Sequence, residues 1–488
     1  PILLFYFYLS VKIYRSIVFS EIAIIIVCVF ILPLASCESP DLSEGRNDQV
    51  NGLLNVTIRI PGNAIEYNAE KKGPYNEGEE IVVKVPTSDE APLDLTRLIC
   101  TVSVEHNCYV DPPLGGELDF TEPRKITVID VNGTLHHNTI RVEPVYPKTR
   151  FINLWKKSCL DLGLATRNNT GVAMNEKYLA VQEYDGPIYL FDKDSGEFIK
   201  KIDAARTFMM KIDVDAAGHF VTARENIYGA GFMVYYYSET ENEHKLLLDY
   251  TDADGCPADM GYEMSVIGDV TKGRAFIYGM APDDMYIYYW ELQDGTLLTP
   301  ANQPNKLRYG AAKGNWSRAQ IQRATLDDSS EHYISYYRPS ADDAENENSS
   351  VKQGSRFNIF STAMEVVELE PSNHAYKILD FKVFNVEQDQ FLVLNEQNYS
   401  AWGNSKVQVF EITDRSMMEL KPGENGYDKF NLFSGEEIAP TNYNVWGDVA
   451  VYSKSTSSGY DVYIAAATVG FDTNESVIRM YKMSYNPQ

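Results

Sequence analysis

Phe232–Tyr236, with the sequence Phe-Met-Val-Tyr-Tyr, is one of six short apolar segments that decide the predicted fold. The other five occupy residues 187–191, 285–289, 356–360, 406–410 and 461–465. Consecutive segments start 45, 53, 71, 50 and 55 residues apart, and each follows another apolar segment. A repeat of about 50 residues with several short strands is typical of a β-propeller, whose small sheets bury their faces against their neighbours in a ring.

Residues 151–488 are therefore predicted to form a six- or seven-bladed β-propeller. Six blades are visible in the pattern, and a seventh would have to lie in residues 151–165 or in the long fourth repeat. The fourth repeat contains residues 339–351, which are rich in Asp, Glu, Asn and Ser and which we interpret as a surface insertion. Two successive β-sandwiches are the alternative arrangement.

The composition indicates an all-β protein and argues against nucleic acid as a partner. Aromatic residues make up 12% of the chain, with 33 tyrosines, and flat rings suit the half-exposed surface of a β-sheet. The net charge is -26 and the pI is about 4.7, whereas binding to phosphate groups requires clustered Lys and Arg. Neutral glycans, peptides, cations and protein partners remain compatible with this charge.

Residues 50–147 are predicted to form a small β-sandwich. Alternating or apolar strand patterns occur at residues 54–60, 81–85, 99–104, 125–131 and 139–145. Turn-forming pairs separate these strands, and they include Gly62-Asn63, Gly78-Glu79, Gly115-Gly116 and Asn132-Gly133. About 95 residues of short strands and turns match the size of an immunoglobulin-type domain.

The first 49 residues contain an export segment and a stalk. Lys12 and Arg15 precede an apolar run from Ile22 to Leu34, whose length suits a signal peptide better than a membrane span. The run ends in Leu34-Ala35-Ser36-Cys37, which resembles a bacterial lipoprotein signal. This resemblance implies that residues 1–36 are removed and that Cys37 is lipidated, with residues 37–49 as an acidic flexible stalk. An ordinary signal peptide or a single-pass anchor is the alternative.

The first methionine in the sequence is Met174. We therefore expect the initiator to lie outside this sequence.

Residues 50–147 also resemble a known domain family. The resemblance rests on the motifs Ile81–Pro86, Asp94–Leu98, Val110–Pro112, Leu118–Phe120, Pro123–Val128, Asn132–Thr134 and Ile140–Val142. This series resembles an uncharacterised immunoglobulin-like domain of surface lipoproteins in Bacteroidota-type gut bacteria, often encoded beside TonB-dependent glycan-uptake systems. The resemblance implies a spacer that holds the C-terminal domain off the membrane and that brings no catalytic residues. His136-His137-Asn138 departs from the family, in which an aromatic residue or threonine is usual.

No stretch of the sequence indicates a catalytic or metal centre. A G-x-S-x-G elbow is absent, and the Cys and His residues lack zinc-site spacing. Asp192–Glu197 and Asp252–Gly255 lack the glutamate that completes a calcium loop, and we interpret them, like Asp213–Gly218, as turns. Cys100 and Cys108 either pair across a hairpin or remain free thiols.

Aromatic residues in polar segments are the candidate binding residues. They are Trp316, Trp402 and Trp446, with Tyr399 and Tyr443 beside the last two. Indole and phenol rings stack on the C–H faces of sugars, and loop tips on one rim of a propeller would bring such rings together. The alternative is that each tryptophan packs between blades, and the segments around Trp402 and Trp446 precede different strands of their repeats. We assign Trp155 and Trp290 to packing.

The combined expectation is a lipoprotein anchored to the outer membrane and facing the cell exterior. It would bind an oligosaccharide or peptide ligand, without a cofactor, as an accessory of a TonB-dependent transporter and its substrate-binding lipoprotein. Two alternatives remain open. The propeller rim could serve adhesion to a protein partner, or the propeller could be a glycosidase or lyase, although no catalytic residues are visible.

Overall fold

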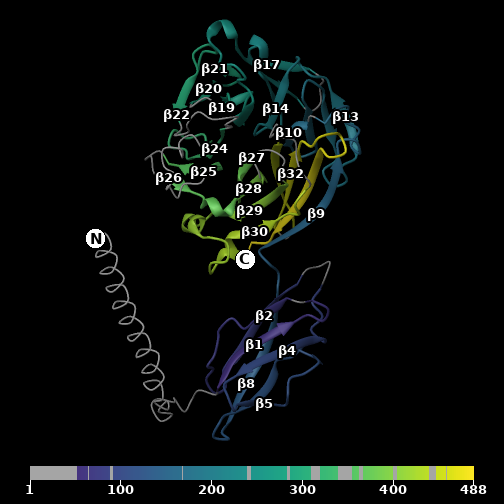
Figure 1. Cartoon of the computed structure of the whole chain (residues 1–488), viewed down its shortest axis with the longest axis vertical. Helices are drawn as coiled ribbons and strands as arrows, with labels where there is room; N and C mark the ends of the chain where they lie inside the picture. The colour runs from purple at the N-terminus through teal and green to yellow at the C-terminus, as the bar shows by residue number, and fades with distance from the viewer. Residues whose placement is uncertain are drawn as a thin grey trace, which may run out of the picture. The chain divides into compact units, whose positions relative to one another are not determined.

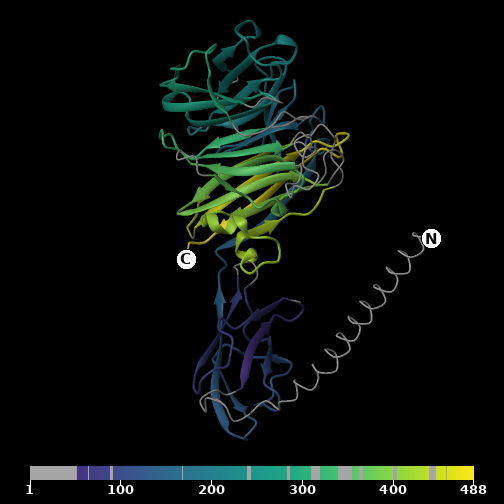
Figure 2. The same ribbon diagram turned by 60° about the vertical axis from the view of Figure 1, so that its left-hand side comes forward.

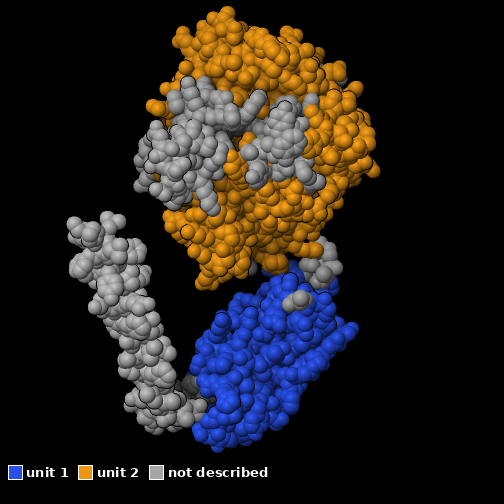
Figure 3. All heavy atoms as spheres, viewed as in Figure 1, with its two compact units in different colours: residues 1–146 blue, residues 147–488 orange. Residues whose placement is uncertain are grey.

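The computed structural model describes residues 52–63, 65–87, 92–167, 169–238, 243–282, 286–308, 319–338, 354–361, 366–398, 404–438, 447–457 and 459–487. Within these ranges the protein is all-β, as predicted. Strands form nearly all of its regular secondary structure, and each helix has only three to five residues. The helices are η1 (Ile227–Gly229), η2 (Asp252–Asp254), η4 (Pro371–Asn373), η5 (Arg415–Glu419) and α2 (Tyr427–Phe430). The chain divides into two compact units, which are residues 1–146 and residues 147–488 (Figure 3).

Unit 1 contains two four-stranded sheets around one core. The strand orders are β2-β1-β4-β6 and β3-β8-β7-β5, and β3 pairs with β8 in parallel. The strands are β1 (Leu53–Arg59), β2 (Glu66–Asn68), β3 (Glu80–Pro86), β4 (Leu98–Val104), β5 (Tyr109–Asp111), β6 (Glu117–Leu118), β7 (Arg124–Ile129) and β8 (Leu135–Val145). Val56 and Cys100 from one sheet and Val83 and Ile140 from the other share this core. The five longer strands match those predicted from the alternating pattern.

The described part of unit 2 forms six sheets that follow one another along the chain, and Figures 1 and 2 show them succeeding one another around the unit. Sheets 1 and 2 are β10 (Asn169–Met174), β11 (Leu179–Glu183), β12 (Ile188–Phe191) and β13 (Phe198–Ile202), then β14 (Met209–Val214), β15 (Phe220–Arg224), β16 (Phe232–Tyr237) and β17 (His244–Tyr250). Sheet 3 is β18 (Glu263–Asp269), β19 (Lys272–Met280), β20 (Tyr286–Gln293) and β21 (Thr296–Leu297), with β22 (Asn305–Arg308) paired to β20.

The last three sheets have the same antiparallel order. Sheet 4 is β23 (Gln320–Arg323), β24 (His332–Arg338), β25 (Gly354–Phe360) and β26 (Val366–Glu368), and sheet 5 is β27 (Lys377–Val386), β28 (Asp389–Gln397), β29 (Ser405–Glu411) and β30 (Asn431–Ser434). Sheet 6 is β31 (Gly447–Ser455), β32 (Tyr460–Thr468), β33 (Val477–Tyr485) and β9 (Thr149–Ser158). The last sheet therefore takes its fourth strand from the beginning of the unit.

The repeat seen in the sequence matches these sheets with one shift of phase. Five of the six apolar segments coincide with third strands, which are β12, β16, β20, β25 and β29. The sixth segment, residues 461–465, lies in β32, which is the second strand of its sheet. Residues 151–158 belong to β9 and complete sheet 6, so this part of the chain supplies no additional sheet. The described residues of unit 2 form six sheets.

The first strands of the six sheets contact one another in a closed ring. We call β10, β14, β18, β23, β27 and β31 the inner strands. Each inner strand contacts the next one in this order, and β31 contacts β10. Sheet 1 and sheet 6 come first and last along the sequence of unit 2, but they are neighbours in space, as Figure 1 shows for β10 and β32.

Polar side chains of the inner strands hold the ring together. One side chain from each inner strand bonds to the backbone of the next inner strand, and we call these contacts the inter-sheet clasps. They join Thr170 Oγ1 to Met210 O (2.6 Å), Val266 N to Asp213 Oδ2 (3.0 Å), Ser265 Oγ to Ile321 O (2.6 Å), Val383 N to Gln322 Oε1 (2.7 Å), Val449 N to Asp380 Oδ2 (2.8 Å) and Val172 N to Asp448 Oδ2 (2.7 Å). Buried backbone groups need such partners, so the clasps explain why polar residues occupy buried positions.

Candidate functional site

Two lysines and four carboxyl groups from the inner strands meet at the centre of the ring. Lys211 Nζ lies 3.0 Å from Glu263 Oε2 and 3.7 Å from Asp448 Oδ1. Lys382 Nζ lies 3.2 Å from Asp213 Oδ1. Lys382 belongs to sheet 5 and Asp213 to sheet 2, which are three places apart in the ring, so this ion pair reaches across the centre. The cluster is therefore an axial charge network that joins non-neighbouring sheets.

Asp380 is the carboxyl group of this network whose pKa is raised. Burial and the neighbouring Asp448, to which it is hydrogen-bonded, raise the pKa of Asp380 well above its usual value. Two adjacent buried carboxyl groups do not both ionise, because their like charges repel in a medium of low dielectric. The protonated form can accept the bond from the Val449 N–H and donate its own proton to Asp448.

Replacing Asp380 by asparagine is expected to stabilise the protein increasingly as the pH rises. The raised folded-state pKa means that the folded state binds a proton that the unfolded state loses above pH 4, so wild-type stability falls with rising pH through this group. Asparagine keeps both hydrogen bonds and has no proton to lose. The gain in the free energy of unfolding relative to wild type should grow by up to about 1.4 kcal/mol per pH unit.

Urea unfolding of both proteins at pH 5 and pH 8 measures this difference. A stability difference between the Asp380→Asn variant and wild type that is the same at pH 5 and pH 8 would contradict the raised pKa, because an ionised Asp380 has no proton to lose in this range.

A cavity of about 170 Å³ lies on the axis beside the charge network, and we call it the axial cavity. All six inner strands line it, and its wall includes Met174, Asp213, Ser265, Gln322, Lys382 and Val451. A second cavity of about 20 Å³ is lined by Lys211, Glu263, Asp380 and Asp448. The axial cavity takes residues from the later parts of β10, β14 and β23, and the smaller one takes residues from the early parts of β18, β23 and β31. The inner strands therefore run in the same direction along the axis.

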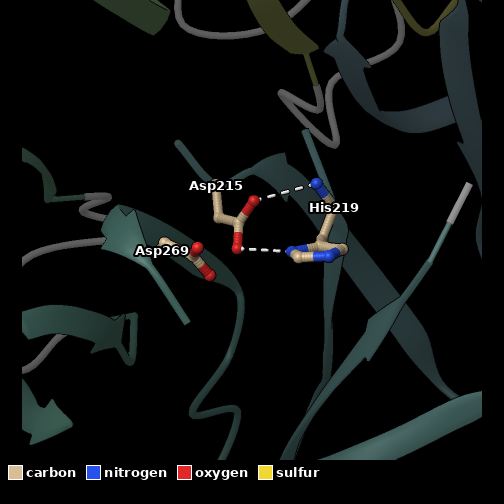
Figure 4. A group of neighbouring side chains, drawn as sticks. All are labelled: Asp215, His219 and Asp269. Atoms are coloured by element: carbon tan, nitrogen blue, oxygen red, sulfur yellow. Dashed lines mark hydrogen bonds and ion pairs between the residues drawn. The ribbon is translucent and has the colours of Figure 1, made fainter. Parts of the chain in front are cut away.

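Asp215, His219 and Asp269 form a compact group with three potential metal ligands (Figure 4). Asp215 Oδ1 accepts bonds from the N–H groups of Ala217 and His219, and Oδ2 accepts from His219 Nδ1 at 2.9 Å and Val270 N at 3.0 Å. Asp269 Oδ1 accepts from Thr271 N and Oγ1. These bonds use both carboxylate oxygens of Asp215. They stabilise the turn between β14 and β15 and connect it to the end of β18.

The other two acidic segments also lie in turns. Asp192 Oδ1 accepts bonds from Ser195 N and Oγ between β12 and β13. Asp252–Asp254 form η2, which ends at Gly255 in the left-handed region with φ of 86°. These residues match the turn interpretation.

The predicted binding residues Trp316, Trp402, Trp446, Tyr399 and Tyr443 lie outside the described residues, and so does Cys37. The strands that flank the three tryptophan segments are described. They are β23, which begins after the first segment, β28 and β29 around the second, and β31 after the third. In an antiparallel sheet the start of the first strand, the end of the second and the start of the third lie at the same end. The described strand ends beside all three segments therefore share one end of the ring.

The two tryptophans assigned to packing are described, and both have structural contacts. Trp290 is fully buried, its ring lies 5.5 Å from that of Phe232, and its Nε1 donates to Ala301 O at 3.1 Å. Trp155 in β9 donates from Nε1 to Lys193 O at 2.9 Å and therefore links sheet 6 to sheet 1. Both assignments are confirmed.

The described cysteines Cys100, Cys108, Cys159 and Cys256 form no disulfide with one another. Burial raises the pKa of Cys100, Cys159 and Cys256 to about 12, so these three thiols are protonated and unreactive at neutral pH. In the part of the chain that the structure describes, no helix has the length and apolar character needed to cross a membrane.

The axial charge network is the feature that the sequence analysis missed. Its signal is the pair of segments Lys211-Ile212-Asp213 and Asp380-Phe381-Lys382, in which opposite charges flank one apolar residue. Both residues of each pair face the same side of a strand, since side chains alternate. The repeat was identified from apolar segments, so it did not indicate the inner strands, which contain these charged residues.

Neither a protein-family model nor a curated protein matches this sequence. Among solved structures the protein is similar to a DUF4623 family protein from Bacteroides eggerthii, with a TM-score of 0.51 and 12% identity, over 89% of this chain and 99% of that chain. It also aligns with Kuenenia stuttgartiensis hydrazine synthase at a TM-score of 0.34 and 8% identity, over 81% of this chain and 94% of that one, which is too low to support an argument. The first likeness shows a shared fold.

Proposed function

We propose that this protein is a surface lipoprotein that retains glycans or other oligomeric nutrients for a TonB-dependent outer-membrane uptake complex. In this proposal Cys37 carries the lipid anchor, unit 1 is an immunoglobulin-like spacer, and unit 2 is a six-bladed β-propeller that binds its ligand without cleaving it. The protein would face the cell exterior beside a transporter and its substrate-binding lipoprotein.

The propeller assignment is supported by the closed ring of inner strands. Each of the six sheets supplies one inner strand, and the chain returns to complete sheet 6 with β9. Closing the last sheet with a strand from the other end of the chain joins the two ends of the ring, which is how a circular array of sheets avoids an open edge. The Bacteroides protein of similar fold supports a Bacteroidota-type origin.

The immunoglobulin-like assignment is supported by two facing sheets with a common core. Buried residues alternate with exposed ones along β3, as expected for a strand with one face in a sandwich. The parallel pairing of β3 with β8 accompanies an otherwise antiparallel sheet.

One observation carries the binding proposal. The strand ends that flank Trp316, Trp402 and Trp446 lie at the same end of the ring, although the three segments precede different strands. Aromatic rings carried from one end of a rigid ring can act together on an extended oligosaccharide, and each stacked ring adds hydrophobic contact with a sugar face.

Replacing Trp316, Trp402 and Trp446 together by alanine is expected to abolish retention of polysaccharides while thermal unfolding stays unchanged. Native gels containing single polysaccharides measure retention as a mobility shift. The matched control is Tyr109→Ala, which removes an aromatic ring that is 58% exposed in unit 1. Retention that survives the triple substitution would exclude these residues as the binding site, and absence of retention by any polysaccharide for wild type would favour the adhesion alternative.

A further inference from the structure

The axial cavity combines an apolar rim with a charged floor. Val214, Ile267, Phe384 and Val451 on its rim are half-buried, whereas Lys382 and Asp213 form an ion pair at its floor. A cavity of about 170 Å³ resembles in size the engineered cavities of about 150 Å³ that bind benzene. The space therefore suits a ligand of roughly six to ten non-hydrogen atoms.

At the floor of the cavity the acceptors of Asp213 are occupied, whereas donors of Lys382 are not. Asp213 Oδ1 accepts bonds from Val214 N at 2.9 Å and from Lys382, and Oδ2 accepts from Val266 N at 3.0 Å. Lys382 has three N–H donors, and Asp213 is its one hydrogen-bond partner among the described residues. The side chain of Lys382 is 22% exposed and lines the axial cavity. The floor therefore offers donors to a ligand and few acceptors.

Arg323 adds a second cation to the cavity wall. Its guanidinium group lies 4.0 Å from the ring centre of Phe276 and donates to Thr325 O at 2.7 Å and to Tyr278 Oη at 3.2 Å. Within the described residues no carboxylate forms an ion pair with it. Burial lowers the pKa of the nearby His332 to about 4, so that His332 is neutral at pH 7.

Carboxyl groups of the axial charge network surround Lys382. Asp213, Asp380 and Asp448 attract Lys382 and raise its pKa, so its ammonium group stays charged at neutral pH. Deeper in the axis Lys211 lies beside Glu263 and Asp448.

We propose that the axial cavity binds a small monocarboxylate with an apolar body. The carboxylate accepts hydrogen bonds from Lys382, and the apolar body lies against Val214, Ile267 and Phe384. Charge-assisted bonds in a partly desolvated site are stronger than those in water, and the apolar rim contributes by burial. This function is separate from glycan retention, because it uses described residues of the inner strands and none of the three tryptophans.

Calorimetric titration of the full chain with benzoate and with benzamide tests the proposal. The two compounds have the same shape, and only benzoate carries a charge. Saturable binding of benzoate at least tenfold tighter than that of benzamide is expected, and the variant lacking Trp316, Trp402 and Trp446 should bind benzoate as wild type does. Equal affinity for both compounds, or no binding of benzoate at millimolar concentration, would overturn the proposal.

A double variant locates the site without leaving a buried charge unpaired. Lys382→Met combined with Asp213→Asn removes both charges of the floor, and benzoate affinity should fall at least tenfold. The matched control is Lys482→Met with Asp461→Asn, which removes an ion pair of 3.4 Å in sheet 6 away from the axis. Benzoate binding that is equal in the double variant and wild type would contradict the proposed site, whatever the effect on stability.

Discussion

Replacing Asp448 by alanine is expected to lower the free energy of unfolding by about 3–5 kcal/mol, the range measured when one partner of a buried ion pair is removed. Asp448 Oδ2 accepts the Val172 N–H at 2.7 Å and Oδ1 accepts the Val449 N–H at 3.0 Å. It also lies 3.7 Å from Lys211 Nζ. Alanine would leave the buried Val172 N–H without this acceptor and would break the clasp between sheet 6 and sheet 1, whereas the Val449 N–H would keep its bond to Asp380 Oδ2.

Urea unfolding at pH 7 measures the loss, and an exposed aspartate supplies the control. Asp472 accepts bonds from Asn474 N and Glu475 N in the loop between β32 and β33. Asp472→Ala should cost less than about 1.5 kcal/mol, because water can replace an exposed acceptor. Equal losses for the two variants would show that the clasp does not contribute to closure of the ring.

Replacing β9 by a glycine-serine segment of the same length is expected to lower the free energy of unfolding by at least about 5 kcal/mol. Two aromatic side chains would no longer be buried, and the edge of β33 would lose its partner strand. Phe151 stacks on Phe433 with ring centres 4.8 Å apart, and Trp155 bonds to Lys193 O. β9 also pairs with β33 along its length. Without it sheet 6 would lack its fourth strand, and the ends of the ring would lose the link through Trp155.

Thermal unfolding of the full-length protein measures this loss as a fall of about 10 °C or more in Tm, using roughly 2 °C per kcal/mol for a large domain. The matched control replaces β13, which is also an outermost strand. Phe198 and Ile199 in β13 are 54% and 45% exposed, and β13 is joined to its own sheet by a local turn. The β13 variant should lose less stability than the β9 variant. The reverse order would contradict closure by β9.

The sequence predicted the sheets of unit 2 because their second and third strands are apolar. Phe232–Tyr236 is a continuous apolar run, Phe220–Ala223 is apolar except for Thr222, and the two segments become neighbours in sheet 2. The inner strands were not predicted, because their buried positions hold Lys211, Asp213 and Asp380. Their polarity is satisfied only by strands far away in the sequence, so no local pattern indicates burial.

The same reason explains the missed charge network and the number of sheets. Lys382 and Asp213 are 169 residues apart in the chain and come together only in the folded ring. Similarly, residues 151–158 have the pattern of a strand, but their partner β33 lies at the other end of the unit. Local periodicity reveals an element, whereas closure depends on contacts between distant segments.

The proposed place of the protein in nutrient uptake can be tested on native membranes. The anchored protein, carrying an affinity tag, would be isolated from outer membranes in mild detergent, and the co-purifying proteins identified and quantified by mass spectrometry. A TonB-dependent transporter and its substrate-binding lipoprotein should be recovered in stoichiometric amounts, and the substrate of that transporter would identify the ligand to test on unit 2. Recovery of the protein alone would contradict the uptake proposal.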